Sequence, residues 1–193
     1  TGSVKTNVGD LVISANQSKS VLVQVLFEPQ TTLRDTLTYD LTAWAIPYVY
    51  GLDAVAVKSD VKMSTAKRFV SKTEKPSGVP YAYILPWKGI WDVKFLSVLF
   101  KNDVVVRVTE EPFELNGKTF DSGTLVITRK GNEKLGKNFD HIIQKTALEN
   151  HRNLTLASTG FVTKGKDFGS SSMRVVQAPK IGLVSGESVS SYR

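Results

Sequence analysis

The clearest pattern of apolar and polar positions lies between residues 81 and 108. An apolar run over residues 81–85 predicts a strand, which Pro86 ends. Apolar residues then recur at helical spacing between positions 91 and 100, and residues 104–108 are a valine-rich run that predicts another strand. Strand, helix and strand in this order favour two parallel neighbouring strands with a right-handed crossover between them.

A hairpin and a second helix are predicted after residue 108. Asn116-Gly117, the strongest short-range hairpin signal, lies between the apolar runs 113–115 and 123–128. The remaining patterns predict a helix over residues 139–147 and strands over residues 173–176 and 181–184.

The pattern in the first 58 residues is weaker. Residues 11–14 are a short apolar run after a Gly-Asp turn and predict a strand. Ser18 could cap a helix with apolar residues at 21, 22, 25 and 26, although the same stretch is β-branched enough for a strand. The aromatic-rich stretch 38–52 predicts a short helix and turn that stop at Gly51, and residues 54–57 predict a strand.

A weak internal repeat divides the chain. Residues 9–14 match residues 123–128 column for column, and a polar turn and a helical pattern follow each copy. This predicts the tail of a first α/β unit over 1–58, a loop or linker over 59–80, and a second α/β unit over 81–178. Residues 179–193 would then begin a further, truncated domain, and residue 1 would be a cut. The expected fold class is α+β with mixed α/β character.

The amino-acid composition and net charge exclude several classes of protein and of binding site. Of 193 residues, 41% are hydrophobic and 22% are charged, which suits a packed core. The net charge of +7 could serve nucleic-acid binding, but the lysines are not patterned, so we expect a solvated surface and no nucleic-acid partner. No apolar run is long enough for a membrane helix, and the absence of cysteine excludes disulfides and thiolate metal sites.

Candidate catalytic groups are sparse. The two histidines, His141 and His151, have no carboxylate three residues later, and His-Glu-x-x-His is absent, so both are expected at the surface and not on a metal. Around Ser185 the glycines are misplaced for a nucleophile elbow. We therefore expect no catalytic residue, no metal ligand and no cofactor in this chain, although spacing alone does not exclude a triad formed in space.

Two further stretches could bind ligands. Residues 165–172 are rich in small residues and could present N–H groups to an anion, but a tight loop beside the sheet is favoured. The aromatics Trp44, Tyr48, Tyr50, Trp87 and Trp91 could stack on sugars or bases, but we expect them in the core.

Several segments of the sequence resemble the region after the catalytic domain in large bacterial zinc carboxypeptidase-like proteins, which belong to the carboxypeptidase A superfamily. The resemblance covers nearly the whole chain and is most specific over residues 40–52. It rests on the segments 26–30, 38–44, 47–52, 123–128, 158–161 and 166–170.

This resemblance implies a parent that removes C-terminal residues from peptides. The zinc and its His-x-x-Glu pair would lie in a preceding peptidase domain, so no catalytic residue is carried over. It also implies a following glutamine-amidotransferase-like domain, whose first strand residues 179–186 resemble, and a periplasmic or secreted location. The chain would be an accessory region that positions domains or contacts the peptide substrate.

Two other functions stay open. The chain could be a carbohydrate- or peptidoglycan-binding module that uses exposed aromatics, or, less favoured, an independent hydrolase. The candidate binding surface is Tyr39, Asp40, Trp44, Tyr48 and Tyr50. Buried aromatics here would favour a scaffold, and an open aromatic shelf would favour ligand binding.

Overall fold

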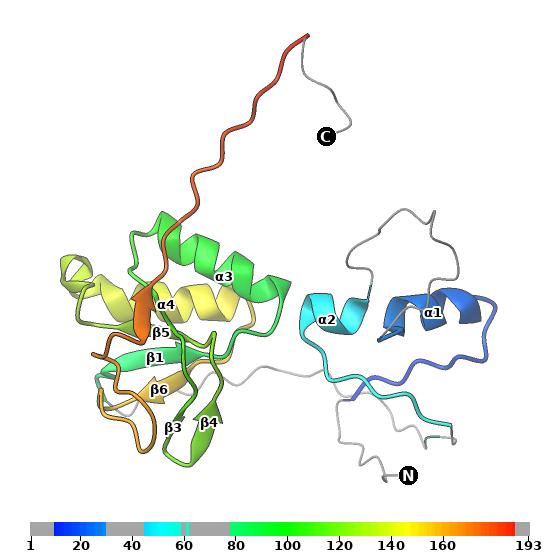
Figure 1. Ribbon diagram of the computed structural model, residues 1–193, viewed down its shortest axis with the longest axis horizontal. Coiled ribbons are helices and arrows are strands. Elements are labelled where there is room, and N and C mark those ends of the chain that lie inside the picture. Colours follow the sequence, from blue (N-terminus) through cyan, green and yellow to red (C-terminus); the bar gives the residue numbers. More distant parts are fainter. Residues whose placement is uncertain (1–9, 30–44, 59–60, 62–77, 188–193) are drawn as a thin grey trace.

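The computed structural model describes residues 10–29, 45–58, 61 and 78–187. The helices are α1 (Ser20–Phe27), α2 (Ile46–Tyr50), α3 (Ile90–Lys101) and α4 (Asn138–Glu149), with a short 3₁₀ turn at Glu133–Leu135. The strands are β1 (Ala82–Leu85), β2 (Arg107–Thr109), β3 (Phe113–Leu115), β4 (Lys118–Phe120), β5 (Leu125–Thr128), β6 (Thr155–Ala157) and β7 (Met173–Val175). The fold is α+β, as the sequence predicts (Figure 1).

The main sheet has five strands in the order β6-β1-β5-β2-β7, and every neighbouring pair is antiparallel. The predicted parallel neighbours β1 and β2 do run in the same direction, but β5 lies between them and pairs with both. The expected adjacent pair is therefore wrong. The order β1-α3-β2-β5-α4-β6 is that of a split β-α-β arrangement, with the β3–β4 hairpin inserted between β2 and β5.

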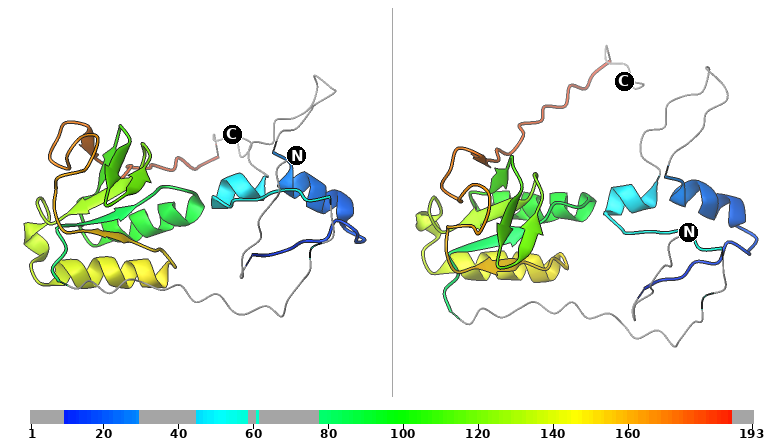
Figure 2. Two further views of the ribbon diagram at one scale, coloured as in Figure 1. Left: turned by 90° about the horizontal axis from the view of Figure 1, so that it is seen from below. Right: turned by 60° about the horizontal axis from the view of Figure 1, so that its bottom comes forward.

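Both faces of the sheet are covered, which explains why β1 and β5 are buried at all four positions. Tyr83 and Leu85 of β1 face a core formed with α3 and α4. Ala82 and Ile84 face the opposite core, where Phe113, Phe120 and Phe168 come from the hairpin and the loop after β6. The result is three layers: helices, sheet, and hairpin with loop (Figure 2).

The Asn116-Gly117 turn joins a hairpin, as predicted, but its second strand is β4 and not residues 123–128. Asn116 and Gly117 have φ angles of 51° and 73°, the left-handed values that a tight two-residue hairpin turn requires. Residues 125–128 instead form β5, the central strand of the sheet. The helices predicted after residues 18, 90 and 138 are all present.

Three predicted strands are absent. Residues 11–14, 54–57 and 181–184 are described as extended chain without strand pairing. Ser18 does not cap α1, which begins after Lys19 with no side-chain cap. Since residues 11–14 form no strand while their supposed counterpart is β5, the structure does not support the internal repeat. Most of the predicted linker, residues 59, 60 and 62–77, lies outside the described residues.

Candidate functional site

Two of the five residues in the predicted binding surface lie on α2. Tyr48 is 66% exposed and Tyr50 is 41% exposed. The helix is short because Pro47 occupies its first turn and Gly51, at φ 62°, ends it by donating its N–H to the Pro47 carbonyl. Tyr39, Asp40 and Trp44 lie outside the described residues.

Helix α2 lies against the start of α3 through two glycines. A Cβ on Gly89 would lie 2.7 Å from the Tyr50 carbonyl carbon, and a Cβ on Gly51 would meet the Lys88 backbone. This approach brings the Tyr50 ring to 6.2 Å from the Trp91 ring, centroid to centroid. The ammonium group of Lys94 lies 5.5 Å from the Trp91 centroid, within range for a cation–π contact.

The expectation that the aromatics are buried is wrong for those described. Trp87 and Trp91 are 41% and 43% exposed, comparable with Tyr50. We call Tyr48, Tyr50, Trp87 and Trp91 the aromatic surface.

The rest of the N-terminal segment is also unusually open. No described residue between positions 10 and 58 is buried. Helix α1 exposes Val21, Leu22 and Val25 at 72%, 51% and 42%. We call this set the N-terminal apolar surface: Leu11, Ile13, Val21, Leu22, Val25, Leu52 and Val55. Single exposed apolar residues are ordinary, but a segment that buries none of its apolar residues is not.

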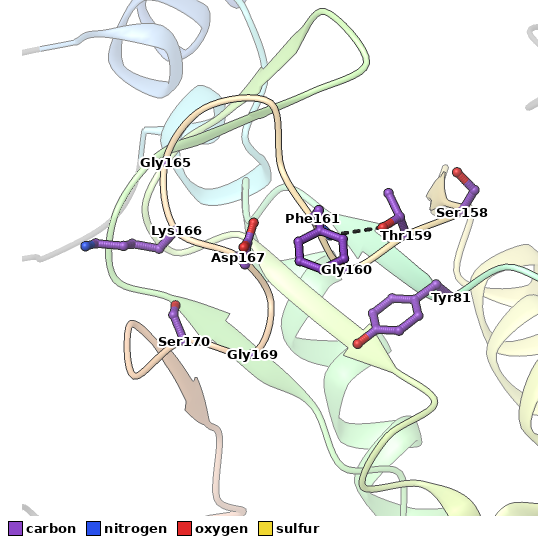
Figure 3. A pocket seen from close by; sticks show the side chains of 10 residues that line it. All are labelled: Tyr81, Ser158, Thr159, Gly160, Phe161, Gly165, Lys166, Asp167, Gly169 and Ser170. Atoms are coloured by element: carbon purple, nitrogen blue, oxygen red, sulfur yellow. Dashed lines mark hydrogen bonds between the residues drawn. The ribbon is translucent and has the colours of Figure 1, made fainter.

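A pocket of about 700 Å³ opens where the loop after β6 folds back on the start of β1 (Figure 3). We call it the loop pocket. Two sequence segments named above, 158–161 and 166–170, meet here, and Tyr81 joins them. Its lining residues are Tyr81, Ser158, Thr159, Gly160, Phe161, Gly165, Lys166, Asp167, Gly169 and Ser170.

Three contacts fix the loop around the pocket. Gly160 lies so close to the Tyr81 ring that a Cβ there would be 2.8 Å from it. The Phe168 N–H donates to the Gly160 carbonyl at 3.0 Å, and the Val162 N–H donates to Asp167 Oδ1 at 2.9 Å. Phe168 itself is buried under the sheet, so this is the loop beside the sheet that the sequence predicts.

One polar atom in the loop pocket lacks a partner. The Ser170 hydroxyl oxygen is shielded from solvent and makes no hydrogen bond within the described part of the chain. The glycine- and serine-rich loop is visible in the sequence. The position of Tyr81 beside this loop is not, because it follows from the pairing of β1 with β6.

The most perturbed titratable groups lie on the helix side of the sheet. Tyr83 donates its O–H to Asp140 Oδ1 at 2.7 Å, and Gln144 donates to the Tyr83 oxygen at 3.0 Å. Burial, reinforced by the hydrogen bond to Asp140, raises the pKa of Tyr83 to about 12. Burial tends to raise the pKa of Asp140, but hydrogen bonds from Arg129 and Tyr83 and the Arg129 charge outweigh it and lower that pKa. Because each polar group here has a partner, this cluster is a structural network.

A second buried carboxylate also has a structural role. Asp92 is fully buried and accepts hydrogen bonds from the Lys88 and Gly89 N–H groups at the start of α3. Its other oxygen pairs with the Arg152 guanidinium at 3.0 Å, which joins α3 to the end of α4.

No catalytic constellation stands out in the described ranges. His141 and His151 are both exposed, and no group of three metal-ligating side chains is found among the described residues. Residues 182–186 are exposed extended chain, without the strand–turn–helix that a nucleophile elbow requires. None of the described helices is long and apolar enough to cross a membrane.

Comparison with known proteins gives no relative: no family model, no curated protein and no solved structure matches this chain.

Proposed function

We propose that this chain is a non-catalytic accessory region of a zinc metallocarboxypeptidase-like protein, and that it docks a neighbouring domain through the N-terminal apolar surface. The family part of this proposal rests on the segments that resemble such proteins, most of all residues 40–52. In this proposal the zinc and the catalytic residues belong to a preceding domain of the periplasmic or secreted parent.

One contrast carries the docking part of the proposal. Residues 78–176 bury apolar side chains on both faces of a sheet, whereas residues 10–29 and 45–58 bury none. Helix α1 has no buried residue, and an isolated eight-residue helix is marginal in water. A partner surface would supply the missing burial, and a specific interface needs roughly 1,200–2,000 Å² in total.

A second contact region extends the same proposal. Ile181, Leu183 and Val184 are 89%, 91% and 78% exposed in a segment that leaves the body after β7 (Figure 1). An extended apolar segment with free N–H and C=O groups is suited to join the edge of another sheet. The following glutamine-amidotransferase-like domain is the partner that the resemblance implies.

The aromatic surface favours a second candidate function. By the criterion set from sequence, exposed Tyr48 and Tyr50 favour a carbohydrate- or peptidoglycan-binding module. The tilted Tyr50–Trp91 pair offers ring faces beside the Lys94 ammonium. Docking is preferred because the exposed aliphatic residues of α1 suit a protein surface better than a sugar.

Charge substitutions in the full-length parent separate these two functions. Val21→Asp and Leu22→Asp should open the interface, increase the radius of gyration in X-ray scattering and expose α1 to protease. Leu148→Asp is the matched control, since Leu148 is 61% exposed on α4, outside the proposed interface. Equal behaviour of all three variants would reject docking through α1.

A separate binding assay tests the alternative function, carbohydrate binding by the aromatic surface. Co-sedimentation with insoluble peptidoglycan should be lost in Tyr50→Ala and Trp91→Ala if the aromatic surface binds glycan. If docking is the function, Tyr50→Ala and Trp91→Ala should co-sediment with peptidoglycan to the same extent as the wild type.

A further inference from the structure

We propose that the loop pocket is a binding site for a sugar ring of a neutral saccharide. The proposal concerns residues 81 and 158–170, so it is independent of the N-terminal docking surface and would stand if docking failed.

Aromatic side chains supply the apolar part of the site. Phe161 is 74% exposed at the pocket, although most phenylalanines of this fold are buried. Tyr81 also lines the pocket, and Gly160 packs directly against part of its ring (Figure 3). An aromatic face with a polar edge suits a pyranose, whose C–H face is apolar and whose rim carries hydroxyls.

Asp167 supplies the polar part of the site, because its carboxylate can accept a hydrogen bond from a sugar hydroxyl. The Ser170 hydroxyl has no partner within the described chain, but it is shielded from solvent, so it is not available to a ligand in the pocket. Asp167 uses Oδ1 to accept the Val162 N–H, and no described group donates to Oδ2. A sugar hydroxyl could donate to Asp167 Oδ2.

Charge favours a neutral ligand over an anion. Asp167 lines the pocket, and its carboxylate would repel a phosphate or carboxylate ligand. Lys166, the cation that an anion site would use, extends away from Tyr81 and Phe161 (Figure 3). The same loop that the sequence suggested for anions is therefore better suited to a polyol.

The test is a titration of the ¹⁵N-labelled chain with neutral trisaccharides, namely chitotriose, cellotriose and maltotriose, followed by amide chemical shifts. At least one should cause saturable shifts at Gly160, Gly169 and Ser170. Inorganic phosphate at the same millimolar concentrations should cause none there.

Four variants make the test specific. Phe161→Ala and Asp167→Asn should each weaken saccharide binding at least tenfold, while Lys164→Ala, at an exposed residue of the same loop that does not line the pocket, should bind as the wild type does. Ser170→Ala should leave binding unchanged and leave Tm unchanged or higher, because it removes an unpaired buried hydroxyl that the ligand does not reach.

Three results would overturn the proposal. One is that none of the trisaccharides shifts the loop amides. Another is that the shifts fall on Tyr50 and Trp91 instead, which would place glycan binding on the aromatic surface. The third is that phosphate binds and Lys166→Ala abolishes it, which would make the loop an anion site.

Discussion

At the scale of single residues, Asp92 joins two helices of the fold, α3 and the end of α4. It caps the start of α3 and pairs with Arg152, and its side chain is only 1% exposed. Removing one partner of a buried pair leaves the other uncompensated, at a cost of about 3 kcal/mol. Asp92→Ala should therefore lower the free energy of unfolding by about this amount in urea denaturation.

The control for Asp92 is a surface ion pair. Lys145 and Glu149 are 3.9 Å apart, and both side chains are more than half exposed. Lys145→Ala should change stability by less than about 0.5 kcal/mol. Comparable losses in the two variants would show that Asp92 is not the buried link that the geometry indicates.

The lowered pKa of Asp140 predicts that the free energy of unfolding decreases at acid pH. Its pKa is lowered in the folded state from the usual 3.8, so folding favours the charged form. The stability that Asp140 contributes is therefore present above pH 3.8 and is lost as pH falls through the folded pKa. Urea midpoints of the wild type and Asp140→Asn should differ at pH 6 and converge towards pH 2; a constant difference would contradict this.

At the scale of elements, the contact between α2 and α3 depends on Gly89. A Cβ there would lie 2.8 Å or less from backbone atoms of Tyr50 and Gly51, which cannot yield as a side chain can. In the full-length parent, where we expect α2 to be protected, Gly89→Ala should detach α2 and remove hydrogen-exchange protection from residues 46–50. Because α2 buries no residue, global stability should change little.

Gly78→Ala is the matched control, since nothing lies within 4 Å of a Cβ at Gly78. Unchanged protection of α2 in Gly89→Ala would mean that the α2–α3 contact does not hold in solution.

Sequence patterns predicted elements well where local signals decide them. Helices α3 and α4 follow from apolar spacing, and the hairpin turn follows from Asn116-Gly117. Pairing is not local, and this is why the insertion of β5 between β1 and β2 was missed. Residues 11–14 and 181–184 have strand-like composition, but a strand also needs a partner, and no described segment pairs with them.

The candidate site was only partly predictable for the same reason. Tyr48 and Tyr50 were found because aromatic density is visible in the sequence, but their exposure was not. The loop pocket needs Tyr81 beside Gly160, a contact between residues far apart in sequence that the β1–β6 pairing creates.

At the scale of the whole molecule, the chain should have no peptidase activity of its own. The sequence has neither His-x-x-Glu nor His-Glu-x-x-His, and the described residues form no metal-ligating group. We expect elemental analysis of the purified chain to find no stoichiometric zinc, and assays with C-terminal peptide substrates to find no cleavage. One tightly bound zinc per chain would refute this.

The central claim is that residues 10–58 complete their burial on another domain. Hydrogen–deuterium exchange of the isolated chain beside the full-length parent tests it most directly. The account predicts that the amides of α1 and α2 exchange quickly in the isolated chain and become protected in the parent, while β1 and β5 are protected equally in both. Equal exchange of α1 and α2 in the two proteins would contradict the claim.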